Sequence, residues 1–374
     1  MSIVICVELS ERSKSELDAL VVQGSYKGYS EAVAVAISNQ LVLQRGASGS
    51  HALILDSAIH PSVPNVTEAP SGAPSPPSKP LPSIPPGFSL SLAQSCQSEP
   101  APFPDDVFVR GSKVTVDRWF FGQHNKLLPV KASCRALAVL MAEQPLGISI
   151  SEAGSKIATE AAELGDYLRQ LDVVSGAIRE EALATAFPEN GPDGDRSRLR
   201  YANQFIANLN AQKQLSGLLV DLKLVSHLRA KEPLLLLTET GLRLAKLSNP
   251  ILDEPMRSNG VPRIRFSDDE ISLLIQHIKD HVPVEDFAFR MVIGAIKEGA
   301  NTPESLDEKL SLMLPPGKKK ISEAFITTQR SGVISRMSDL DLILRRRDGI
   351  RVKYEATSRG NAYLSGQQGV EHER

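Results

Sequence analysis

Basic side chains gather in one stretch near the C-terminal end of the sequence. Residues 315–359 contain 11 Lys and Arg against 5 Asp and Glu, whereas the whole chain has a formal net charge of −2. Clustered positive charge attracts phosphates, because each neutralised phosphate releases condensed counterions. The near-neutral total argues against a chain that binds nucleic acid indiscriminately as a polycation, so any nucleic-acid affinity has to come from a local patch. The alternative is that the two basic triplets, residues 318–320 and 345–347, are ordinary solvated loop charges.

The elements that must position this charge are a helix and a β-hairpin. Apolar residues recur at helical spacing from Val333 to Leu340, which indicates one apolar stripe on a helix. Residues 342–346 and 350–354 have the pattern of two strands around a turn at Arg347-Asp348-Gly349. An Asp-Gly pair provides the positive φ that a tight hairpin turn needs. The stretch therefore predicts a helix, a short link and an arginine-rich hairpin.

A helix followed by such a hairpin resembles the recognition helix and wing of a winged-helix DNA-binding domain. Thr327 or Thr328 can cap the helix, and the resemblance then implies that the first turn reads base edges while the wing holds phosphates. An unbroken helix from Ile321 would instead turn Arg330 toward the apolar stripe. The expected DNA contacts in this stretch are Lys318, Lys319, Lys320, Thr327, Thr328, Gln329, Arg330, Arg336, Arg345, Arg346, Arg347, Arg351 and Lys353.

Residues 1–45 form a separate small unit by pattern. A strand at residues 3–9 precedes two helices, at about residues 11–22 and 30–44, and this order resembles the ribbon-helix-helix family of Arc- and CopG-like DNA binders. The resemblance implies a homodimer that pairs the two strands, with Lys27, Tyr29 and Ser30 near phosphates. The outward ribbon residues would be Val4, Cys6 and Glu8, which offer few donors to bases. Two functions therefore remain for this unit: dimerisation alone, or dimerisation together with sequence-specific DNA recognition.

A proline-rich tether is expected between this unit and the rest of the chain. Thirteen of the 25 prolines lie between Pro61 and Pro104, among Ser, Ala and Gly. Such composition favours an extended, disordered linker, which we predict over residues 46–105. Its PSPPSKP and PSIPP segments are also possible polyproline ligands.

The remainder has the pattern of an internal duplication. The sequence DLKLV at residues 221–225 matches DLDLI at 339–343, and Thr238-x-x-Gly241 matches Thr357-x-x-Gly360. These motifs resemble MarR-like winged helices, which implies one domain at residues 106–255 with a helical insertion at about 160–196. A second domain follows at 261–365, with a disordered tail at 366–374. Because the first wing carries few basic residues, the second copy is the expected DNA contact and the first is a site for protein docking or dimerisation.

The sequence contains no complete motif for catalysis or metal binding. Leu312 stands where the first glycine of a P-loop would be, and the three cysteines form no C-x-x-C pair. His277 and His281 could share a metal, but no third ligand follows and a solvated pair is expected. We therefore predict no enzymatic activity, no cofactor and no metal site.

No signal peptide and no run of about 18 apolar residues is present, so a cytoplasmic, nucleoid-associated protein without membrane contact is expected.

Taken together, these patterns predict a mainly α fold with small β-hairpins: a ribbon-helix-helix module, a Pro-rich linker and two winged-helix domains. The predicted function is sequence-specific binding of double-stranded DNA as a homodimer, in a prokaryotic transcriptional or plasmid/mobile-element regulator. One alternative is a replication or partition initiator. Another is a non-enzymatic structural adaptor that uses its winged helices for protein docking.

Overall fold

The structure is a computed structural model that describes Asp18 and residues 83–104, 115–178, 181–209, 214–228, 233–253, 264–314, 322–349 and 351–365. The chain divides into two units, Met1–Ser78 and Lys79–Arg374, and every element described below belongs to the second. The predicted ribbon-helix-helix module, with Lys27, Tyr29 and Ser30, lies outside the described residues. So do Lys318, Lys319 and Lys320, and the predicted tail.

The first half of this unit is built on helices α4 and α5. Helix α4 has a proline in its first turn and is almost wholly buried, whereas α5 begins at a Ser149 cap and ends at Gly176 in the left-handed conformation. The elements of this half are η1 (Pro86–Phe88), α3 (Leu90–Ser95), η2 (Val116–Arg118), α4 (Leu128–Glu143), β1 (Ile148–Ser149), α5 (Ile150–Ser175), α6 (Gly194–Tyr201), the π-helical η3 (Ala202–Ile206), β2 (Asn208–Leu209), β3 (Leu215–Ser216), α7 (Leu218–Asp221), β4 (Val225–Leu228), β5 (Leu234–Leu237) and α8 (Glu239–Lys246).

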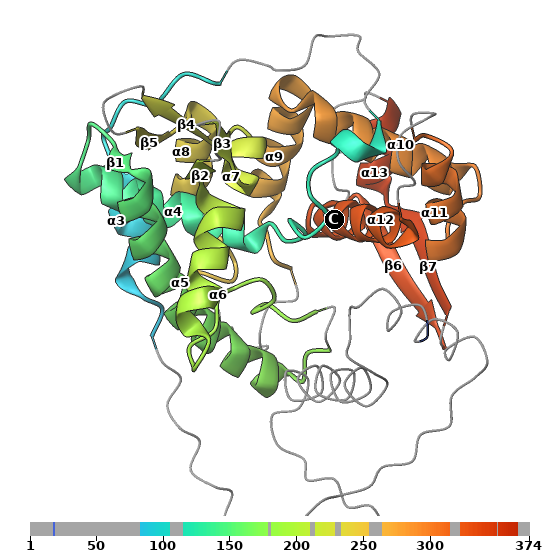
Figure 1. The fold of residues 1–374 in the computed structure, drawn as a ribbon, viewed down its shortest axis with the longest axis horizontal. Helices are drawn as coiled ribbons and strands as arrows, with labels where there is room; N and C mark the ends of the chain where they lie inside the picture. The colour runs from blue at the N-terminus through green and yellow to red at the C-terminus, as the bar shows by residue number, and fades with distance from the viewer. Residues whose placement is uncertain are drawn as a thin grey trace, which may run out of the picture. The chain divides into compact units, whose positions relative to one another are not determined.

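The second half repeats the order of helices, hairpin and closing helix (Figure 1). Its first helix opens on a capping box between Ser267 and Glu270. The elements are α9 (Asp268–His281), α10 (Pro283–Lys297), α11 (Pro303–Ser311), α12 (Glu323–Asp339), β6 (Ile343–Asp348), β7 (Arg351–Ala356) and α13 (Ser358–Ser365). The described sheets are small and antiparallel, in the orders β1-β5-β4, β2-β3 and β6-β7. The predicted fold class is therefore confirmed as mainly helical with small hairpins.

The two DL-x-L motifs adopt the same turn. In each, the residue before the last leucine has positive φ, 53° at Lys223 and 54° at Asp341. That leucine's carbonyl accepts the backbone N–H of the threonine that caps the closing helix. The threonine hydroxyl in turn accepts the N–H of the glycine three residues later. The donor–acceptor distances are 2.9 Å for Thr238 to Leu224, 3.1 Å for Thr357 to Leu342, 3.3 Å for Gly241 to Thr238 and 2.9 Å for Gly360 to Thr357.

Replacing either capping-motif glycine by alanine should destabilise the fold. A Cβ on Gly241 would lie 2.0 Å from the Leu224 carbonyl oxygen, and one on Gly360 would lie 2.0 Å from that of Leu342. Forced shifts of this kind cost about 1–3 kcal/mol. Gly294 of α10 is the matched control, because nothing lies within 4 Å of its added Cβ and alanine there should stabilise the helix by about 0.5–1 kcal/mol. Urea unfolding of the three variants measures both effects, and a tolerated Gly241→Ala would contradict the turn geometry.

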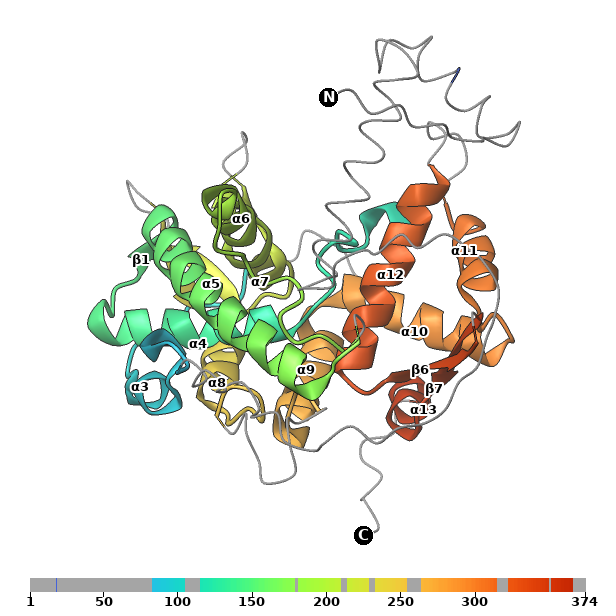
Figure 2. The ribbon, with the colours of Figure 1, turned by 90° about the horizontal axis from the view of Figure 1, so that it is seen from below.

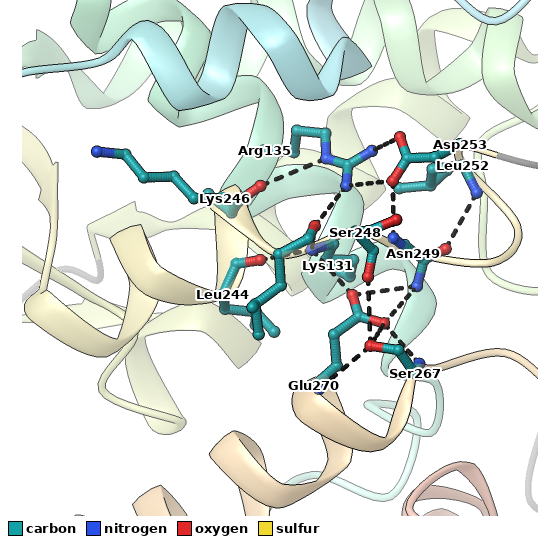
Figure 3. Close-up of polar contacts among 12 residues, drawn as sticks. Lys131, Arg135, Leu244, Lys246, Ser248, Asn249, Leu252, Asp253, Ser267 and Glu270 are labelled. Carbon is teal, nitrogen blue, oxygen red and sulfur yellow. Dashed lines mark hydrogen bonds and ion pairs between the residues drawn. The ribbon is translucent and has the colours of Figure 1, made fainter.

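A buried polar cluster joins the two halves (Figure 3). Lys131 of α4 lies 2.8 Å from Glu270 of α9, and both side chains are fully buried. The Lys131 ammonium also donates to the carbonyls of Leu244 and Leu247 at the end of α8, where a cation is favoured. Burial lowers the pKa of Lys131 to about 8. Since its three protons all have acceptors, this lysine holds α4, α8 and α9 together and offers no reactive amine.

The predicted linker is wrong for residues 83–104. Phe88 and Cys96 are buried, and Ala101 donates its backbone N–H to the Leu237 carbonyl at 2.8 Å. Apolar residues between the prolines therefore pack on the body, which composition alone did not indicate. The two predicted domains also form one compact unit rather than separate bodies, because the buried cluster and the α8–α9 contact connect them.

Candidate nucleic-acid interface

The predicted hairpin is confirmed by strands β6 and β7, but Arg347 and Asp348, which were predicted in the turn, belong to β6. They pair from Ile343 opposite Ala356 to Asp348 opposite Arg351, around Gly349 with φ of 60°. Directly opposed residues of an antiparallel pair share one face of the hairpin. Arg346 and Lys353 therefore lie on one face, and Arg345 lies beside Tyr354 on the other.

The root of the hairpin is fixed to the helical body. Ile343 and Tyr354 are buried, and the Tyr354 backbone N–H donates to the Asn301 carbonyl at 2.8 Å. The outer part of the hairpin is exposed, and Arg346 pairs with Glu355 at 2.6 Å. The exposed basic side chains are Arg345, Arg346, Arg347, Arg351 and Lys353. The hairpin thus presents positive charge on a rigidly anchored element.

Helix α12 begins earlier than a threonine cap would place it. Its cap is Ser322, whose hydroxyl accepts the Phe325 N–H at 3.3 Å, and the helix runs unbroken from Glu323 to Asp339. The prediction that Thr327 or Thr328 caps the helix is therefore wrong. Thr327 donates to Asp307 of α11 at 2.9 Å, and Thr328 donates to the Ala324 carbonyl one turn earlier.

The early start turns two predicted base readers inward. Gln329 is 2% exposed and Arg330 is 8% exposed. Arg330 lies 2.7 Å from Asp307, and its guanidinium donates to the Tyr354 hydroxyl at 3.1 Å. The prediction that these side chains reach base edges is wrong, because both are buried inside the body. The partners of Arg330 are Asp307 of α11 and Tyr354 of β7.

Arg336 is also unavailable to DNA. Its side chain is fully buried against Glu285 of α10, with Nη2 3.0 Å from Oε2, and it donates to the His124 carbonyl. Its guanidinium also lies 5.6 Å from the centre of the Phe120 ring. Arg336 therefore connects three segments of the body, and its predicted role as a DNA contact is wrong.

The chain segment at residues 116–127 covers one face of α12 (Figure 2). A Cβ on Gly332 would lie 2.5 Å from the Gly122 carbonyl oxygen, so the two backbones touch. The Leu127 N–H donates to Asp339 at the end of the helix, at 2.9 Å. The exposed side chains of α12 are those of Glu323 and Ala324 in its first turn and of Thr327, Ser331 and Ser338 farther along. None of them is basic.

His277 is buried, whereas the sequence predicts that it lies on a solvent-exposed face of its helix. It is 3% exposed, and its Nε2 lies 2.7 Å from the Leu222 carbonyl. His281 stacks on Phe103 with ring centres 4.2 Å apart. Among the described residues, no group of three or more His, Cys, Asp or Glu side chains could hold a metal ion.

Stability should fall in acid because of His277. Burial lowers the pKa of His277 from 6.5 to about 4, so the unfolded chain takes up this proton first. The contribution is fully present above pH 6.5 and is lost as the pH falls toward 4, by about 3 kcal/mol in all. Urea unfolding at pH 7, 5.5 and 4.5 measures it. His277→Gln, which can still donate to Leu222, should flatten this pH dependence, and an unchanged slope would assign the effect to other groups.

Comparison of the chain with protein-family models, with curated proteins and with solved structures found no match. None of the helices in the described ranges is long and apolar enough to cross a membrane. The assignment of a function therefore depends on the geometry of the hairpin and of the helix beside it.

Proposed function

We propose that this chain binds double-stranded DNA, with the β6–β7 hairpin as its main contact. The observation that carries the proposal is the set of five exposed Arg and Lys side chains on this hairpin. The hairpin sequence holds only two acidic residues, Asp348 and Glu355. A rigid root with exposed cations lowers the ordering cost of holding phosphates, and such contacts supply affinity that does not depend on sequence.

The order of helices, hairpin and closing helix supports a tandem winged-helix assignment for the two halves. We propose this winged-helix assignment together with a role as a prokaryotic regulator. The alternative role is that of a replication or partition initiator. Specific reading through Gln329 and Arg330 is not part of this proposal, because both side chains are buried. Sequence preference would depend on hydroxyls such as those of Thr327 and Ser331, so we expect affinity to exceed discrimination.

Fluorescence anisotropy of the full chain with labelled duplexes tests the proposal. Two duplexes of unrelated sequence should bind with similar Kd, and the logarithm of affinity should fall linearly with the logarithm of salt concentration. If neither duplex binds at low salt, the proposal is overturned.

A structural adaptor is the second candidate function. The observation that favours it is the cover over α12: the helix expected to enter a groove is packed against Gly122 and Phe120 of the same chain. Winged helices of this kind could dock proteins instead of DNA. A chain that shows no salt-dependent affinity for duplexes would favour this function.

Dimerisation is expected to require the N-terminal unit. The strand predicted at residues 3–9 needs a partner strand for its backbone groups, and the boundary of the folded body lies at Lys79. In sedimentation equilibrium, the full chain should be a dimer and a chain beginning at Lys79 a monomer. A body that dimerises as tightly as the full chain would place the interface elsewhere.

A further inference from the structure

A polar cleft of about 600 Å³ lies between α8 and α9 and is separate from the hairpin. Side chains from both helices line it, and Phe103 from the segment before α4 contributes one wall. Neither the DNA-binding proposal nor the buried cluster of Lys131 uses this cleft. Three features describe the chemistry of the cleft: its aromatic rings, a hydrogen-bond acceptor without a partner, and the charge of its rim.

Three rings form one side of the cleft. Phe103 and His281 stack with centres 4.2 Å apart and planes 19° from parallel. His277 lies 5.7 Å from Phe103 and 5.2 Å from His281, measured between ring centres. Flat surfaces of this kind suit a planar group, and they attract a cation through their π faces.

His277 leaves a hydrogen-bond acceptor without a partner. Its Nε2 lies 2.7 Å from the Leu222 carbonyl, which can only accept, so Nε2 carries the proton. Nδ1 is therefore an acceptor, and it is buried with no hydrogen-bond partner within the described structure. A buried polar atom without a partner is costly. Because Nδ1 has almost no accessible surface, a ligand in the cleft donates to it only after a neighbouring side chain moves.

The rim of the cleft is predominantly acidic. Glu239 of α8 and Asp269 and Asp280 of α9 line it with exposed side chains, and Arg243 is the basic side chain among its lining residues. The balance favours a cation near the rings. An oxyanion ligand would meet three carboxylates and is disfavoured.

We infer that this cleft binds a guanidinium group. A guanidinium is planar, is always charged and carries five N–H donors, so one group matches the rings, the histidine acceptor and the acidic rim. An ammonium has the charge and the donors but no planar face, and a neutral nucleobase lacks the charge. The guanidinium could belong to free arginine or to an arginine side chain of a protein partner.

Calorimetric titration of the full chain with L-arginine and with the blocked peptide acetyl-Gly-Arg-Gly-amide tests this inference, with L-lysine as the control ligand. We expect arginine, the peptide or both to bind at least 10-fold more tightly than lysine. Binding should also shift the His277 ring resonances in spectra of histidine-labelled protein. Binding of arginine alone would indicate a small-molecule site, and tighter binding of the peptide would indicate a protein partner.

The rim provides the matched variants. Asp269→Asn with Asp280→Asn keeps shape and removes charge, and it should weaken guanidinium binding at least 10-fold. Glu304→Gln with Glu308→Gln changes two exposed carboxylates on α11, away from the cleft, and should leave binding unchanged. Equal affinity for lysine and arginine, no binding of either guanidinium ligand, or unchanged affinity in the rim variant would each overturn the inference.

Discussion

Replacing Arg345, Arg346 and Arg347 together by alanine is expected to weaken binding to every duplex alike, on the order of 100-fold near physiological salt. The three side chains are exposed on β6, and each phosphate that they neutralise releases about one counterion. The slope of log affinity against log salt should therefore become shallower by up to about 3. Arg346 pairs with Glu355, so its contact with a phosphate would compete with that ion pair.

The control for this variant uses arginines of similar exposure in another part of the chain. Arg196 and Arg200 of α6 are exposed, and replacing both by alanine should leave the affinity and the salt slope nearly unchanged. Anisotropy titrations at four salt concentrations separate the two variants. If the triple variant binds with unchanged affinity and slope, the hairpin is not the contact surface and the adaptor function takes precedence.

Replacing Arg336 by methionine is expected to cost about 3–5 kcal/mol of stability, because it leaves the Glu285 carboxylate buried without a partner. Glu285 is fully buried, and two guanidinium nitrogens of Arg336 contact its two oxygens. The variant also loses the hydrogen bond to the His124 carbonyl, which connects α12 to the covering segment. Urea unfolding measures the loss.

A paired variant isolates the buried charge as the cause. Combining Arg336→Met with Glu285→Met replaces both charges by unbranched apolar side chains, and most of the lost stability should return. DNA affinity of the paired variant should equal that of the unchanged chain, since Arg336 is fully buried. Weakened DNA binding in a stable paired variant would instead restore Arg336 as a DNA contact.

The local sequence pattern was sufficient to predict the hairpin, the helix and the two capping turns. Alternation and an Asp-Gly turn predicted the hairpin that β6 and β7 form, and apolar spacing predicted a helix at α12. The repeated Thr-x-x-Gly motif marked two turns that prove to have the same hydrogen bonds. These features depend on residues within a few positions of each other, through φ preferences, caps and helical period.

Only the tertiary structure decided which side chains face outward. Arg330 and Arg336 are surface cations by residue type, but they meet Asp307 and Glu285, which stand 23 and 51 positions away. Gly122 reaches Gly332 from a segment whose proximity no local pattern indicates. A buried charge is tolerated where an opposite charge and hydrogen bonds meet it. That condition depends on how distant segments pack, so it was settled by the fold and not by the order of residues along α12.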